Sequence, residues 1–209
     1  MRITVIGTGN VGGTLGRRWA EAGHDVTFGT RDPSSDKVKQ LLGSLGGKAR
    51  AAAAKEAVED ADVVVLATPW PAAQEVLRGL GPLAGRVLLD CTNPLTRSLA
   101  LEVGLSTSGG EQVAAWSGGA RVVKIFNTTG SENMASPRYG EQPATMFYAG
   151  DDAEAKQIAA QLARDLGFEP VDAGPLVNAR LLEPLAALWI YLAYPGGQGR
   201  HIAFKLLRQ

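Results

Sequence analysis

Cysteine and histidine are scarce in this sequence. Cys91 is the only cysteine, and His24 and His201 are the only histidines among the 209 residues. One cysteine cannot form a disulfide within the chain or a zinc site of several cysteines, so we expect no metal site. We expect Cys91 to fill space. His24 precedes the second predicted strand, away from strand ends that could hold a ligand, and His201 lies near the carboxyl terminus, so neither is a predicted catalytic group.

The sequence has no excess of charge of either sign. Lys and Arg together number 21, and Asp and Glu together also number 21. A neutral chain offers no broad electrostatic attraction to nucleic acid or to an anionic membrane. We therefore expect no nucleic-acid or membrane partner, and any recognition of anions must be local.

Long hydrophobic runs are also missing. The apolar run that precedes Gly7 is too short for the core of a signal peptide. The most apolar stretch, residues 185–194, falls far short of the roughly 20 residues that cross a bilayer, and it predicts a buried helix. Together with the single cysteine, this predicts a cytoplasmic location.

The length and composition favour one domain. A chain of 209 residues with 45% hydrophobic content can bury a substantial core, and domains commonly have about 150 residues. We predict a single domain over residues 1–209, in which the residues from about 175 form a helical closure at the carboxyl terminus.

Strand-like apolar runs recur through the first two thirds of the chain. Most are continuously apolar, which is typical of parallel strands covered on both faces. Helical segments are expected between them, at residues 11–22, 54–59 and 71–80. This order predicts a Rossmann-type α/β fold, a doubly wound and mainly parallel sheet with helices on both faces. The predicted strands are residues 3–6, 26–28, 63–67, 87–89 and 122–126.

The last third predicts two helices and two more strands. Residues 146–148 form an apolar run, and Asp151 and Glu154 have capping-box spacing before a helix that ends at Gly167. A short strand is expected at 168–172. A closing helix from about Asn178 to Tyr194 should end at Pro195-Gly196-Gly197.

Two long connections leave the carboxyl ends of predicted strands, where open α/β sheets place ligands. Residues 104–119 are rich in Gly and Ser around a short segment with Trp116, and residues 127–144 are polar with two prolines. They are candidate walls of a substrate site, and the alternative is two flexible surface loops.

A glycine motif follows the first predicted strand at once. Gly7-Thr8-Gly9-Asn10-Val11-Gly12 has the spacing G-x-G-x-x-G and opens a predicted helix. Gly7 permits a tight turn, Gly9 lets the backbone approach a pyrophosphate, and Gly12 allows the helix to pack closely on the strand. The free N–H groups of the helix would face the anion, so the motif predicts a dinucleotide site.

The end of the second predicted strand favours NADP over NAD. NAD-binding proteins usually place Asp or Glu there to bind the ribose hydroxyls, whereas this chain has Thr30 followed by Arg31. The planar guanidinium of Arg31 suits a 2′-phosphate. Asp32 is the competing signal, because a shift of two positions would place a carboxylate near the ribose.

The ends of two further predicted strands supply candidates for the nicotinamide half. The stiff segment Ala67-Thr68-Pro69-Trp70 follows one of them, and Trp70 either walls the nicotinamide or simply packs. Asn93 follows the other and could hydrogen-bond a carboxamide. No acid–base group stands out, and hydride transfer between two bound rings needs mainly positioning.

With these residues, the chain resembles the family of F420-dependent NADP oxidoreductases and is similar to the reductase domain of STEAP metalloreductases. The motifs that carry the resemblance are the glycine turn, Gly29-Thr30-Arg31, Ala67-Thr68-Pro69-Trp70, Gly150-Asp151-Asp152, and 171–176 followed by Asn178-Ala179-Arg180.

The resemblance implies hydride exchange between NADP(H) and coenzyme F420, a deazaflavin, in a homodimer. It assigns residues 7–11 to the pyrophosphate, Thr30 and Arg31 to the 2′-phosphate, and Thr68, Pro69 and Trp70 to the nicotinamide half. The loop 127–144 departs from the short apolar turn expected beside the deazaflavin. The full set of candidate cofactor-binding residues is Gly7, Thr8, Gly9, Asn10, Val11, Gly12, Thr30, Arg31, Ala67, Thr68, Pro69, Trp70 and Asn93.

Three functions remain open from the sequence. The first is an oxidoreductase that transfers hydride between NADPH and F420 or a flavin-like acceptor, which we expect to be a small molecule. The second is an NADPH-dependent reductase of a quinone or a small carbonyl compound. The third is a non-catalytic NADP(H) sensor that changes partners on binding.

Overall fold

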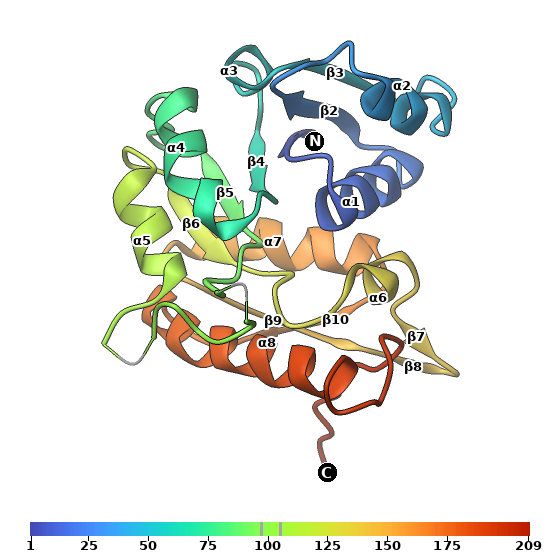
Figure 1. The fold of residues 1–209 in the computed structure, drawn as a ribbon, viewed down its shortest axis with the longest axis vertical. Coiled ribbons are helices and arrows are strands. Elements are labelled where there is room, and N and C mark those ends of the chain that lie inside the picture. The colour runs from blue at the N-terminus through green and yellow to red at the C-terminus, as the bar shows by residue number, and fades with distance from the viewer. Residues whose placement is uncertain (97, 105) are drawn as a thin grey trace.

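The computed structural model describes residues 1–96, 98–104 and 106–209 and contains a central twisted sheet (Figure 1). The sheet has eight strands in the order β10-β9-β6-β5-β4-β1-β2-β3, and every neighbouring pair is parallel except β6 and β9. The order reverses direction at β1, as in doubly wound folds. The strands are β1 (Arg2–Ile6), β2 (Asp25–Thr30), β3 (Ala49–Ala53), β4 (Val63–Leu66), β5 (Val87–Asp90), β6 (Arg121–Lys124), β9 (Thr145–Gly150) and β10 (Glu169–Asp172).

Helices cover both faces of the sheet. On one face, α1 and α7 bury Leu15, Trp19 and Leu162 against the strands. On the other, α4 and α5 bury Leu77 and Val113. The predicted Rossmann-type architecture is therefore confirmed. The helices are α1 (Asn10–Glu21), α2 (Asp36–Gly43), α3 (Ala54–Ala57), α4 (Trp70–Leu80), α5 (Gly109–Trp116), α6 (Ser131–Ala135), α7 (Ala153–Asp165), the 3₁₀ turn η1 (Leu176–Asn178) and α8 (Ala179–Ala193).

Both connections predicted as long loops contain regular structure. The segment 104–119 holds α5, and the segment 127–144 holds α6 and a hairpin of β7 (Arg138–Tyr139) and β8 (Gln142–Pro143). Helix α5 was not predicted because it begins with two glycines, which are poor helix formers. A Cβ at Gly109 would lie 3.0 Å from a carboxylate oxygen of Glu183, and one at Gly110 would lie 3.0 Å from the Cβ of Ala179. These glycines permit close packing of α5 on α8.

Two smaller expectations need correction. The N-cap of α7 is Asp152, whose carboxylate accepts a hydrogen bond from the N–H of Ala155, and it is not Asp151. Asp151 instead accepts from the N–H of Leu176 at 2.9 Å and holds the start of η1. The edge elements α2 and β3 were not predicted, because the alanine-rich sequence of β3 carries little strand propensity.

The closing helix α8 is buried on one face only. Ala186 and Trp189 lie in the interior, whereas Leu181, Leu188 and Tyr191 are exposed by 48% or more. The buried helix expected over residues 185–194 is therefore correct only for the inner face of α8. Among the described residues, one helical stretch, Leu176–Ala193, is long and apolar enough to span a membrane by length and composition, and 39% of it is buried in the fold.

A buried cluster of charges fixes α8 and α5 to the ends of the strands. The ammonium group of Lys124 on β6 lies 2.9 Å from Asp90 on β5, its register partner, and 2.9 Å from Glu183 on α8. Lys124 also donates to the carbonyl of Thr92 at 2.6 Å. Burial alone would lower the pKa of Lys124, but the attraction of Asp90 and Glu183 outweighs it and raises that pKa.

The second carboxylate of this cluster also binds the start of α5. Glu183 accepts hydrogen bonds from the backbone N–H groups of Gly109 and Gly110, both at 2.9 Å. These groups lie at the helix N-terminus, where a negative charge is favoured. The cluster could have been suspected from the sequence, because Lys124 interrupts the apolar run 122–126.

We expect Lys124→Met to lower the free energy of unfolding by about 3–5 kcal/mol, because it leaves two buried carboxylates without their cation. Urea denaturation at neutral pH measures this. Lys39→Met is the matched control, since the Lys39 side chain is 66% exposed and pairs only with Asp36 among the described residues; we expect a change within about 0.5 kcal/mol. Equal effects of the two substitutions would contradict a structural role for the cluster.

Candidate functional site

The junction of β1 and α1 admits only glycine at two positions, Gly7 in the turn and Gly12 in the first turn of α1. Gly7 has a φ of 115°, and a Cβ there would lie 2.5 Å from the carbonyl oxygen of Ala67. A Cβ at Gly12 would lie 2.1 Å from the carbonyl oxygen of Gly7. The roles predicted for these two glycines, a tight turn and close packing of helix on strand, are the ones that the geometry requires.

The third glycine faces open space. A Cβ built on Gly9 meets no atom within 4 Å. Gly9 is the N-cap of α1, no side chain among the described residues caps the helix, and its first turn carries no acidic residue. The first N–H groups of α1 are thus free to bind an anion, and the residues present fit a pyrophosphate.

The corner at the end of β2 carries the two competing residues, Arg31 and Asp32. The carboxylate of Asp32 accepts hydrogen bonds from the Ser34 backbone N–H at 2.9 Å and from the Ser34 hydroxyl at 2.6 Å. The hydrogen bond from the Ser34 side chain is the largest cause that lowers the pKa of Asp32. The Asp32 carboxylate therefore stabilises the turn that follows β2. Arg31 is exposed, and it has no ion pair within the part of the chain that the structure describes.

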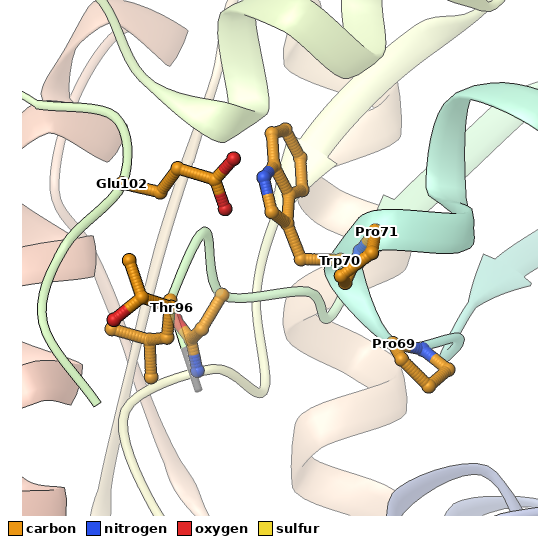
Figure 2. Close-up of a pocket in the computed structure, with 7 residues that line it drawn as sticks. Pro69, Trp70, Pro71, Thr96 and Glu102 are labelled. Carbon is orange, nitrogen blue, oxygen red and sulfur yellow. The ribbon is translucent and has the colours of Figure 1, made fainter. Parts of the chain in front are cut away.

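Trp70 opens α4 and walls a cavity of about 550 Å³ at the ends of β4 and β5 (Figure 2). Its indole packs on that of Trp116, with ring centroids 5.3 Å apart and the planes inclined by 32°. The flanking prolines fix the backbone on both sides of Trp70. The residues that line the cavity are Pro69, Trp70, Pro71, Asn93, Leu95, Thr96 and Glu102.

Glu102 was not among the predicted site residues. Figure 2 shows its carboxylate facing the indole of Trp70 across the cavity. It lies in a segment with no periodicity, and backbone pairing brings it there: the N–H of Glu102 donates to the carbonyl of Pro94 at 2.7 Å. No sequence pattern marks Glu102 as a cavity residue, because this backbone pairing places it there.

Asn93 joins the end of β5 to the end of β6. Its side-chain NH₂ donates to the backbone carbonyl of Asn127 at 3.0 Å, and its side-chain oxygen accepts from the Asn127 NH₂ at 3.1 Å. The Asn127 side-chain oxygen is buried without a partner among the described residues. The preceding Phe126 has a φ of 61°, a strained value for such a residue. Asn93 thus positions two strand ends, and a role toward a carboxamide stays a prediction.

A second cavity of about 610 Å³ lies against the phosphate-binding turn. It is bounded by α1, α2, α6 and the segment that follows α8. Ser131, Glu132 and Ala135 of the segment 127–144 line this second cavity, whereas Asn127, at the start of that segment, bonds to Asn93 beside Trp70 in the first. The full lining is Thr8, Gly9, Asn10, Gly13, Thr14, Arg17, Lys37, Gln40, Leu41, Ser44, Ser131, Glu132, Ala135 and Arg200.

Cys91 and His24 lie outside the reactive part of the site. Cys91 is buried, and burial strongly raises the pKa of its thiol, so the thiolate needed for nucleophilic attack is disfavoured. His24 bonds to Asp165 at 2.9 Å on the opposite edge of the sheet. Both observations agree with the roles predicted from the sequence.

The parallel sheet, the glycine turn and the uncapped helix α1 define the class of the protein, a Rossmann-type fold with the features of a dinucleotide site. Known proteins agree with this class. A family model described as NADP oxidoreductase coenzyme F420-dependent matches residues 2–94. The F420-dependent NADP reductase of Methanothermobacter thermautotrophicus is 31% identical, over 92% of this chain and 89% of that protein.

Two further comparisons extend the similarity. A crystal structure of a chain from Arthrobacter sp. FB24, proposed to be an F420-dependent NADP-reductase, superposes with a TM-score of 0.90 and 33% identity over 99% of both chains. Metalloreductase STEAP3 of Rattus norvegicus is 28% identical over 88% of this chain, which spans only 36% of that protein. The chain belongs to the family of F420-dependent NADP oxidoreductases, and it is an NADP-dependent oxidoreductase.

We expect Gly9→Ala and Gly12→Ala to act differently. At Gly9 the new methyl group meets open space, so the free energy of unfolding should stay within about 0.5 kcal/mol while the affinity for NADP⁺ falls. At Gly12 the methyl group overlaps backbone, which should cost about 1–3 kcal/mol or more of stability. Urea unfolding and titration calorimetry measure the two quantities. A stable Gly9→Ala protein with unchanged NADP⁺ affinity would contradict the assignment of this turn to the cofactor site.

Proposed function

We propose that this protein transfers hydride between NADPH and a fused-ring acceptor, either the deazaflavin coenzyme F420 or a flavin. The observation that carries the proposal is the Trp70 cavity, which an indole and two prolines line at the strand ends of a dinucleotide fold. Such walls offer flat apolar surface to a ring system. The names of the similar archaeal reductases support F420 as the acceptor.

The residues of the chain would act mainly by binding and positioning. Bound NADPH would supply the hydride and leave as NADP⁺, and the acceptor would gain that hydride and a proton from solvent. The free N–H groups of α1 would hold the pyrophosphate, and Trp70 would limit the plane in which the rings can stack. Asn93, fixed by Asn127, would keep the neighbouring strand ends in register.

We assign the 2′-phosphate to Thr30 and Arg31, since Asp32 is occupied by its own turn. Arg31→Ala should weaken NADPH binding roughly 10- to 150-fold, which is the loss of charged hydrogen bonds worth about 1.5–3 kcal/mol. NADH lacks this phosphate, so its affinity should barely change. Titration calorimetry with both cofactors measures the difference, and equal losses for NADPH and NADH would contradict the assignment.

Turnover against a panel of acceptors tests the reaction itself. We expect NADPH oxidation with F420 or flavins, and we expect Trp70→Ala to raise the KM for the acceptor roughly tenfold, the size of an aromatic contact of about 1.4 kcal/mol. The affinity of Trp70→Ala for NADPH should change less than this KM. Trp70→Phe keeps an aromatic ring and should have a KM for the acceptor close to that of the wild type. Rapid reduction of small carbonyl compounds without activity on fused rings would contradict the proposal, and binding of NADPH without any turnover would indicate a sensor.

Reduction of a quinone or a small carbonyl compound is the second candidate, and Glu102 is the observation that favours it. Such substrates need a proton delivered next to the hydride acceptor, and the Glu102 carboxylate faces into the Trp70 cavity (Figure 2). In the same panel, Glu102→Gln should abolish carbonyl or quinone reduction but leave transfer to a fused ring nearly unchanged.

The proposal extends to the state of the protein in the cell. We propose a single domain that works as a homodimer in the cytoplasm. The exposed stripe of Leu181, Leu188 and Tyr191 along α8 supports this assembly, because an apolar helix face of this kind is typical of contacts between chains. The opposite face of α8 packs in the interior, so the exposed stripe would keep a fixed position on the surface.

A further inference from the structure

The segment that follows α8 returns to the phosphate-binding turn. The buried side chain of Asn133 on α6 donates to the carbonyl of Arg200 at 3.2 Å and to that of Ile202 at 2.7 Å. The indole N–H of Trp189 donates to the same Ile202 carbonyl at 2.7 Å. These bonds fix the backbone on both sides of His201, and they place Arg200 in the lining of the second cavity.

Within this cavity the guanidinium of Arg200 pairs with the carboxylate of Glu132. It also lies over the ring of Tyr194, 5.7 Å from the centroid. The Arg200 side chain is 43% exposed and that of Glu132 is 23% exposed, so the pair stands at the surface of the cavity. One oxygen of Glu132, Oε2, is buried with no hydrogen-bond partner among the described residues.

The cavity concentrates positive charge in a chain that has none overall. Its lining has three basic side chains, Arg17, Lys37 and Arg200, against a single acidic one, Glu132. Thr8, Gly9 and Asn10 of the phosphate-binding turn line the same space. A pyrophosphate seated on α1 would therefore lie in the cavity that Arg200 enters.

The negative charge of Glu132 would repel an anion bound in this cavity, so its role belongs to the protein without ligand. Glu132 lies in the first turn of α6, where the helix N-terminus favours its negative charge, and it neutralises Arg200 when no ligand is present. A bound pyrophosphate offers Arg200 a better partner, because a guanidinium binds phosphate oxygens through two parallel hydrogen bonds.

We propose that Arg200 binds the pyrophosphate of the cofactor, and that Glu132 competes with this phosphate for the Arg200 guanidinium. The inference rests on the proposed dinucleotide site and adds a residue from the carboxyl-terminal segment to it. Because the pyrophosphate is common to NADP(H) and NAD(H), Arg200 contributes to binding both, unlike Arg31.

The test is calorimetric titration of three variants with NADP⁺ and NAD⁺. Arg200→Gln should weaken both cofactors roughly tenfold. Glu132→Gln should do the opposite and strengthen both, by about two- to fivefold, because it removes the competing charge. Arg208→Gln is the matched control: this arginine lies on the same segment, pairs with Glu169 far along the tail and should leave both affinities unchanged.

The opposite signs separate this proposal from a structural ion pair. If Arg200 and Glu132 only fasten the tail, both variants would lower the melting temperature and neither would change cofactor affinity selectively; that result overturns the proposal. Arg200→Lys keeps the charge but loses the planar guanidinium, so its affinity for both cofactors should lie between those of the wild type and Arg200→Gln. This variant replaces Arg200→Gln in the test if the latter does not fold. A wild-type protein that binds neither cofactor would refute the dinucleotide site as well.

Discussion

The buried ion cluster around Lys124 is the constraint on which the rest of the site depends. One ammonium and two carboxylates are almost completely withdrawn from water, and each finds its partners within 3 Å. Such a cluster tolerates little displacement, because loss of any contact leaves a buried charge without compensation. It ties β5, β6, α5 and α8 together at the edge of the sheet where ligands bind.

The two cavities differ in the chemistry of their linings. The Trp70 cavity is lined by aromatic and proline surface, and the cavity at the phosphate-binding turn is lined by basic side chains and free helix N–H groups. The first suits a ring and the second suits phosphates. Both lie at the carboxyl ends of strands, so one extended ligand and a stacked partner could use them together. Under the proposed hydride transfer between two rings, such an arrangement would act mainly by positioning.

The sequence predicted the framework of the fold well, because its signals are local. Runs of apolar residues define β1, β4, β5 and β6, and the glycine turn requires glycine for reasons contained within a few residues. The failures depend on distant contacts. Helix α5 was missed because Gly109 and Gly110 make room for Glu183 and Ala179, about seventy residues later in the chain. No local pattern records such packing.

The same distinction holds for the site. The backbone roles predicted for Gly7 and Gly12 rest on a spacing motif and match the lack of space for a side chain at both positions. Arg200 and Glu102 could not be found, since a tail fixed by Asn133 and a backbone pairing with Pro94 bring them to their cavities. The segment 127–144 reaches both cavities: Asn127 bonds to Asn93 beside Trp70, and α6 packs toward α1 and lines the second cavity.

Direct hydride transfer is the central claim of this account, and isotope labelling tests it most directly. NADPH that carries deuterium at C4, placed at each of the two prochiral positions in turn, is incubated with the protein and oxidised F420, and the reduced F420 is examined by mass spectrometry. A deazaflavin retains the label because the hydride adds to carbon. We expect deuterium in the product from one of the two positions and not from the other. Reduced F420 without deuterium from either position, or no oxidation of NADPH, would contradict the claim.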